Sequence, residues 1–206
     1  HHVIAWLLGE SANLKEQLEA HLLSQLLLDN SASPLRKALE KCEFASAPSP
    51  MCGLEDSNRE MSFMCGIEGS NVADADAFEA LVFEILNEVA EKGVEQKEID
   101  SVLHQLEFHQ REIGGDSHPY GMQLIFSGMS AATHYGDPVA MINIEPALAA
   151  LKEDAKDPQF VQNLIKALLL NNRHFVRLTL RPDRELGAEE LRIEKSKLTK
   201  MKAALS

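Results

Sequence analysis

The hydrophobic positions of the chain fall into stretches with helical spacing and shorter apolar runs. Residues 3–8 form a continuous apolar run closed by Gly9, which is typical of a buried strand. Residues 13–28 carry leucines three and four positions apart, which predicts a helix with a buried face. Pro34 lies in the first turn of a second, shorter helix over residues 35–41. The amino-terminal part therefore predicts one strand followed by two helices.

The apolar spacing changes to a period of two beyond residue 43. We expect strands over residues 44–47 and 61–67, paired antiparallel across a polar connection that contains the turn-prone residues 55–58. The β-branched and aromatic residues of 175–180 predict a final strand. We expect this strand to return to the sheet of the first one.

The rest of the chain favours helix. The stretches concerned are residues 74–92, 96–113, 120–135, 139–155 and 160–170. Gly93, the pair Gly114 and Gly115, and the pair Asn171 and Asn172 end three of them. This order of elements predicts an α+β fold, with one mainly antiparallel sheet and helices packed on one of its faces.

Composition narrows the class of protein. The chain has 206 residues, of which 45% are hydrophobic and 25% charged, so we expect it to fold as a soluble globular protein. Its net charge of −12 argues against nucleic acid or an anionic membrane surface as a partner. No apolar run approaches the roughly 20 residues of a membrane-spanning helix. Three cysteines without a C-x-x-C motif favour a reducing compartment, the cytoplasm or an organelle matrix.

The two ends of the chain differ from the rest. Residues 183–206 contain six basic and five acidic side chains, whereas residues 1–182 contain 14 basic and 27 acidic ones. This predicts a charged helix outside a compact domain, either a solvated linker or the start of a further domain. The opening His1 and His2, native or left from a tag, precede no basic segment, so we expect an internal fragment rather than a signal peptide.

His104, Glu107 and His109 are the most suggestive group of metal-binding residue types. The group is one residue longer than H-x-x-E-H, in which two histidines share a helix face and the glutamate is the general base. Positions i and i+5 of a regular helix point about 140° apart. His104 and His109 therefore cannot hold one ion without a rare π-bulge, and we expect exposed polar helix faces.

The remaining histidines of interest lie near turns. His118 and His134, with Asp116 and Asp137 close in sequence, could be ligands or acid–base pairs, but these residue types are common at turns. We expect no catalytic role for them.

Nucleophile motifs are absent from the sequence. Cys42, Cys52 and Cys65 have no histidine at a telling spacing, and Cys65 lies in an apolar strand, which favours packing. The serines in turn or capping contexts, outside any G-x-S-x-G motif, are Ser11, Ser33 and Ser70. We therefore predict no catalytic, cofactor-binding or metal-binding residue in this chain.

Several long segments, in this order, resemble one family. They are WLLGES at 6–11, LLLDNSASPLRKALE at 26–40, APSPMCGLEDSNREMSF at 47–63, LHQLEFHQREIGGDSHPYGMQLI at 103–125, GDPVAMINIEPAL at 136–148 and NNRHFVRLTLRPD at 171–183. Together they resemble the second, non-catalytic homologous domain of the presequence protease-like branch of the pitrilysin/insulinase zinc metallopeptidases. The resemblance covers residues 1–183, and residues 184–206 resemble the start of the helical linker between the two halves of those enzymes.

The resemblance implies an enzyme of four homologous α+β domains that encloses unfolded peptide substrates in a chamber. It implies zinc bound by H-x-x-E-H and a distal glutamate in the first domain, with the other domains of the same chain as the partners of this one. In this chain the first helix after the first strand offers His21, with Ser24 and Gln25 where the glutamate and second histidine would stand. The resemblance thus implies an isolated fragment that holds no zinc and is inactive.

Two alternatives remain from the sequence. One is a non-enzymatic scaffold or partner subunit of the same fold, and the other is an unrelated α+β binding module. The acidic balance of residues 1–182 suits a chamber wall that attracts basic peptides, and equally a solvated acidic exterior.

Overall fold

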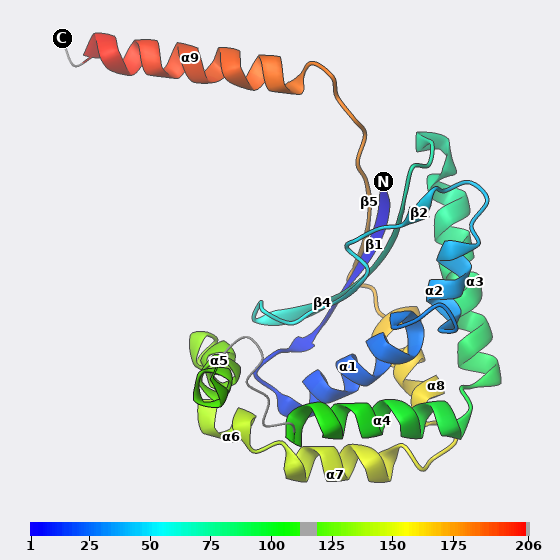
Figure 1. Ribbon diagram of the computed structural model, residues 1–206. Helices are drawn as coiled ribbons and strands as arrows, with labels where there is room; N and C mark the ends of the chain where they lie inside the picture. Colours follow the sequence, from blue (N-terminus) through cyan, green and yellow to red (C-terminus); the bar gives the residue numbers. More distant parts are fainter. Residues whose placement is uncertain (112–118, 205–206) are drawn as a thin grey trace.

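The computed structural model describes residues 1–111 and 119–204 (Figure 1). The strands in this part of the chain are β1 (His2–Glu10), β2 (Ala47–Pro48), β3 (Gly53–Glu55), β4 (Glu60–Glu68) and β5 (Phe175–Thr179). They form one antiparallel sheet in the order β2-β4-β1-β5, with β3 also paired to β4. The return of the last strand to the first is confirmed.

The helices of the described residues follow the predicted stretches. They are α1 (Leu14–Leu28), α2 (Pro34–Glu40), α3 (Ala75–Lys92), α4 (Gln96–Arg111), α5 (Tyr120–Thr133), α6 (Pro138–Ile142), α7 (Glu145–Asp154), α8 (Phe160–Ile165) and α9 (Leu186–Ala204), with short turns η1 (Val72–Asp74) and η2 (Lys166–Leu170). Gly93 ends α3 with φ 78°, a conformation that glycine adopts without strain. The α+β fold is confirmed.

The prediction of a strand over residues 44–47 is wrong. The Ala45 amide instead donates to the Cys42 carbonyl in a turn, at 3.4 Å. Only β2 pairs with β4 here, and its second residue, Pro48, has no N–H to extend the ladder. The segment expected to be a simple polar connection contains β3, which begins at Gly53 with φ 133°.

Alternate residues of β1 and β4 form the floor of the core. Ile4 and Trp6 of β1 lie opposite Cys65 and Phe63 of β4, and all four side chains are buried. The Trp6 ring also lies 6.3 Å from that of Phe175 in β5, centroid to centroid. Buried leucines of α1 and the apolar stripe of α3 cover this face, so the helices pack on one side of the sheet, as predicted (Figure 1).

On the opposite face of the sheet, β5 and the end of β1 present apolar side chains that are open to solvent. Leu7, Val176 and Leu178 project from this face with exposed fractions of 40%, 58% and 46%. Their side chains alternate with those that point into the core, because neighbouring strand residues face opposite sides. Residues 1–111 and 119–204 provide no helix that covers this face (Figure 1).

The last strand is fixed to the helical layer and to the first strand by polar contacts. Arg177 of β5 donates to Asp76 and Glu79 of α3, each at 2.7 Å. Buried His2 of β1 contacts the Thr179 hydroxyl at 3.0 Å. These contacts tie β5 to α3 and to β1 although about 100 residues or more of sequence separate the partners.

Beyond β5 the chain leaves the body of the molecule. α9 projects away from the sheet and helices, and none of its residues is buried (Figure 1). The structure thus has the charged helix that the sequence predicts for this part of the chain. No described helix is both long and apolar enough to cross a membrane.

Leu22→Ala should lower the free energy of unfolding by about 3–5 kcal/mol, because Leu22 is fully buried on the core face of α1. The matched control Leu7→Ala, on the open sheet face, should cost about 1 kcal/mol or less. Urea denaturation followed by circular dichroism measures both. Equal losses would contradict the assignment of the two faces.

Candidate functional site

Helix α1 presents a polar pair at the side of the core. Asn13 caps the helix by accepting a hydrogen bond from the Glu16 amide, and the leucine stripe directs His21 to the partly exposed face. His21 Nε2 lies 3.0 Å from Asp56 Oδ2. Gln17, one turn earlier, donates to the same oxygen from its Nε2 at 3.2 Å. The helix thus holds one carboxylate oxygen with two side chains.

Asp56 comes from the loop between β3 and β4. The hydrogen bond from His21 holds the pKa of Asp56 below its usual range, against the opposing effect of its partial burial. Asp56 is therefore ionised at neutral pH. The next residue, Ser57, accepts a hydrogen bond at its carbonyl from His134 Nε2 at 2.9 Å, at the end of α5. The loop is held from both sides.

Asp56 and His21 line a cleft of about 590 Å³, here named the α1–α5 cleft. Its apolar lining is Leu14, Leu18, Leu106, Tyr120, Leu124, Met141, Ile142 and Ile144. Its polar lining is Gln17, His21, Gln25, Asp56, Ser57, Gln105, Ser127 and Ser130. None of these described lining residues is lysine or arginine, and Asp56 is the carboxylate among them.

The polar groups of this cleft suit binding more than catalysis. A hydrolytic site needs a nucleophile within hydrogen-bond reach of its base, but Ser127 donates to the Gln123 carbonyl at 3.0 Å. The described residues contain no group of three or more His, Cys, Asp or Glu side chains placed to hold a metal ion. Gln25 Oε1 is buried there without a hydrogen-bond partner among the described residues. The cleft therefore offers acceptors rather than a reactive group.

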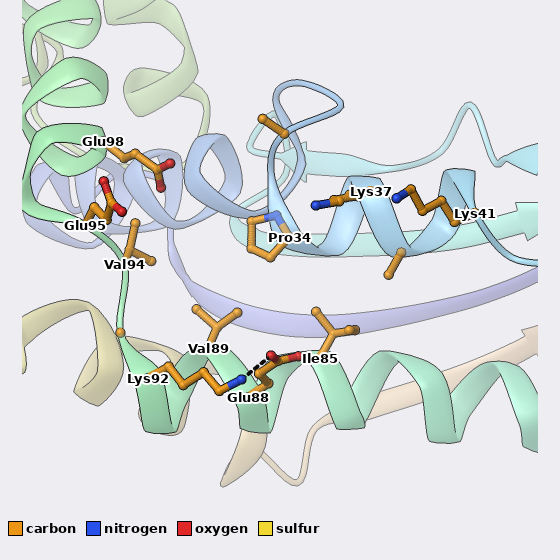
Figure 2. Close-up of a pocket in the computed structure, with 13 residues that line it drawn as sticks. Pro34, Lys37, Lys41, Ile85, Glu88, Val89, Lys92, Val94, Glu95 and Glu98 are labelled. Carbon is orange, nitrogen blue, oxygen red and sulfur yellow. Dashed lines mark hydrogen bonds and ion pairs between the residues drawn. The ribbon is translucent and has the colours of Figure 1, made fainter.

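A second cleft, the α2–α3 cleft, has a different character. It measures about 490 Å³ and has an apolar floor that includes Ile85 and Val89. Figure 2 shows Lys37 on α2, Lys41 directly after it, Glu95 and Glu98 near the start of α4, and the ion pair between Lys92 and Glu88. The Lys92 Nζ and Glu88 Oε1 atoms of this pair lie 2.6 Å apart. Charges of both signs line this cleft, so it has no clear preference for an anion or a cation.

The suggestive cluster on α4 shows no metal site within the described residues. His104 is exposed, and the side chain of His109 lies outside the described part of the chain. Glu107 forms an ion pair with Lys152 of α7 at 2.5 Å, so it joins two helices of the outer layer. The prediction that the side chains of His104 and His109 point about 140° apart therefore stays a prediction.

Of the histidines and aspartates predicted near turns, His134 and Asp137 lie in the described part of the chain, and both make contacts that support the fold. Asp137 caps α6 by accepting from the amides of Val139 and Ala140 at 2.8 and 3.3 Å. His134 ends α5 and contacts the Ser57 carbonyl. Asp116 and His118 lie outside the described residues.

The cysteines and serines form no catalytic group in the described part of the chain. Cys65 is fully buried, as its place in an apolar strand predicts, and Cys42 and Cys52 are partly buried. Ser11 donates to the Asn58 carbonyl at 2.6 Å, and Ser33 makes a weaker contact with the Gln25 carbonyl at 3.4 Å. The Ser70 hydroxyl is buried without a partner among the described residues.

This architecture is shared with the non-catalytic domains of a peptidase family. Residues 1–106 match the family described as Peptidase M16 inactive domain. Because the match covers more than half of the 206 residues, the chain belongs to this family. The family resemblance drawn from the sequence is confirmed.

Curated relatives narrow the comparison. The chain is 32% identical over 204 residues to the mitochondrial presequence protease of Xenopus tropicalis. This alignment covers 98% of this chain and 20% of that protein. It is 32% identical over 208 residues to presequence protease 1, chloroplastic/mitochondrial, of Arabidopsis thaliana, covering 98% of this chain and 19% of that protein. The chain thus spans about a fifth of the length of these relatives.

Solved structures support the fold. An inactive peptidase domain from Bordetella parapertussis superposes with a TM-score of 0.60 at 19% identity, over 89% of this chain and 92% of that one. The ferredoxin protease FusC, solved in complex with Arabidopsis ferredoxin, superposes with a TM-score of 0.59 at 15% identity. The superposition covers 85% of this chain and 18% of that one. At these identities the comparison concerns the fold alone.

Sequence reasoning missed the pairing of His21 with Asp56. The two residues are 35 positions apart, and the sequence placed Asp56 in a turn without a tertiary partner. The signal that could have indicated it was the acidic turn between two strands that follow the first helix. Only the packing of that hairpin against α1 brings the groups together.

Cysteine labelling tests the packing. Burial raises the pKa of the Cys65 thiol well above its usual range, and burial also raises the pKa of Cys42 and Cys52. At neutral pH we expect iodoacetamide to leave Cys65 unmodified in the native protein and to modify the other two slowly, as read by mass spectrometry. Native labelling of Cys65 as fast as in denaturant would contradict its burial.

The lowered pKa of Asp56 has a consequence for stability. A carboxyl whose pKa is lower in the folded state stabilises the fold above its unfolded pKa of about 3.9, and this stabilisation is lost as the pH falls through the folded value. Asp56→Asn should therefore lower the melting temperature at neutral pH, and the difference from wild type should shrink below about pH 4. A difference that persists unchanged into strong acid would contradict this.

Proposed function

We propose that this chain is the non-catalytic second domain of a zinc metalloendopeptidase of the presequence protease type. The observation that carries the proposal is the match of residues 1–106 to the Peptidase M16 inactive domain, within a chain that aligns over 98% of its length to a fifth of a presequence protease. The parent enzyme would hydrolyse unfolded peptides with zinc-activated water. Residues 1–183 would contribute structure and surface to its amino-terminal half.

The open face of the sheet supports a role as part of a chamber wall. Leu7, Val176 and Leu178 present apolar side chains there, and an exposed apolar surface of this kind marks a place for another domain or a peptide. The 27 acidic and 14 basic side chains of residues 1–182 would favour peptides of positive charge. The partners would be the other homologous domains of the same chain and peptide substrates, without nucleic acid or membrane.

The residues of α1 do not fit a zinc site. His21 lies on this helix, but Ser24 and Gln25 supply neither a general base nor a second imidazole ligand. Zinc would belong to the first domain of the parent, outside this chain. Residues 184–206, with the fully exposed α9, would begin the linker between the two halves.

The relatives described above carry mitochondrial or chloroplastic names and are called presequence proteases. On this basis the parent would work in an organelle matrix or an equivalent reducing compartment. Its substrates would include transit peptides, which are amphipathic, rich in arginine and poor in acidic residues.

Zinc content and peptide hydrolysis of the purified 206-residue chain test the proposal directly. We expect no stoichiometric zinc and no turnover of an unfolded peptide, because no described group supplies a ligand set. Atomic absorption and a fluorogenic peptide assay measure the two quantities. Near-stoichiometric zinc together with turnover would refute the non-catalytic assignment.

The coding sequence before Val3 separates the enzyme from a scaffold of the same fold. An H-x-x-E-H motif about one domain length upstream in the same reading frame supports the peptidase. Its absence supports the alternative of a non-enzymatic scaffold or partner subunit.

A further inference from the structure

We propose that the α1–α5 cleft is a subsite for an arginine-bearing segment of an amphipathic peptide, with Asp56 as the anionic group that binds the guanidinium. This inference rests on the proposed function, because it assigns a substrate contact to a domain that performs no chemistry.

The charge of the cleft selects a cation. Asp56 is ionised at neutral pH, and the described residues that line the cleft include neither lysine nor arginine to neutralise it. The nearest imidazole, His21, already directs its Nε2 to Asp56. The Asp56 carboxylate lies in a partly apolar recess, where a bound cation is attracted more strongly than in open water.

The hydrogen bonds of Asp56 leave room for a ligand. His21 and Gln17 both use Oδ2, so Oδ1 receives no side-chain hydrogen bond from the described residues. A guanidinium can therefore donate to Oδ1 without displacing either partner.

The apolar wall accounts for the amphipathic character of the peptide. Leu124 and Ile142 line the side of the cleft formed by α5 and α6, and Leu18 lines the side formed by α1. These groups can cover the aliphatic stem of an arginine or a neighbouring apolar side chain. The volume of about 590 Å³ lies within the range of pockets that bind small ligands in proteins.

The α1–α5 cleft and the α2–α3 cleft differ in how they would receive such a peptide. An arginine-rich amphipathic segment complements the α1–α5 cleft, which combines an anion with apolar walls. The α2–α3 cleft is lined by three lysines and three glutamates, so its charges offer such a segment no net attraction (Figure 2). The charge and the apolar lining therefore point to the α1–α5 cleft as the place of binding.

Binding of a labelled peptide to the 206-residue chain tests the subsite. The probe is a short amphipathic peptide of leucine, serine and arginine, and its matched control replaces each arginine by citrulline, which keeps the shape and removes the charge. We expect fluorescence anisotropy to show binding of the arginine peptide and at least about tenfold weaker binding of the citrulline peptide.

Two variants with the same change of charge locate the site. Asp56→Asn should weaken binding of the arginine peptide by about five- to tenfold, because it removes the anion and keeps an acceptor for His21. Glu91→Gln, on the exposed side of α3, removes one charge elsewhere and should change the affinity by less than about twofold. Ser127→Phe should fill the cleft and weaken both peptides. Circular dichroism checks that each variant is folded at the temperature of the measurement.

The outcomes separate this inference from the proposed function. Absence of arginine-peptide binding, or equal weakening by Asp56→Asn and Glu91→Gln, would overturn the subsite and leave the non-catalytic assignment intact. Zinc-dependent turnover by this chain would overturn the assignment whatever the peptide affinities are.

Discussion

The pairing of β1 with two strands that lie far from it in sequence is the constraint on which the rest of the structure depends. β1 pairs with β4 on one side, in continuous register from His2 to Leu7, and with β5 on the other, from His2 to Trp6. Its inward residues, Ile4 and Trp6, are fully buried and provide the surface on which the helices pack. Without this central strand β5 would have no partner in the sheet, and β4 would pair only with the short strands β2 and β3.

The same arrangement explains why polar chemistry collects at one side of the domain. α1 follows β1 directly and packs on the sheet through its leucines, which turns His21 toward the hairpin of β3 and β4. That hairpin presents Asp56 to the helix, and α5 completes the recess through His134 and its contact with Ser57. The recess therefore offers one carboxylate and apolar walls, which suit recognition by charge and shape.

Periodicity is enough to predict the elements that bury a regular face. The leucines of α1 and the alternation in β1 and β4 are signals of that kind, because burial on one side imposes a period on the sequence. β2 and β3 carry no such signal, since two or three residues cannot show a period and Pro48 interrupts the ladder. The pairing of His21 with Asp56 is also beyond sequence reasoning, because a contact between a helix and a distant turn depends on how the hairpin packs.

His1, before β1, and Leu180, after β5, are hydrogen-bonded to each other at one end of the β1–β5 ladder, and this has a mechanical consequence. The amino group of His1 donates to the Leu180 carbonyl at 3.0 Å, and the Leu180 amide donates to the His1 carbonyl at 2.9 Å. A pull between His1 and α9 would therefore load the ladder of β1 and β5 from its end, and its hydrogen bonds would break one after another instead of sharing the force. The ion pairs of Arg177 and the stacked rings of Trp6 and Phe175 would then oppose the separation of β5 from the rest of the domain.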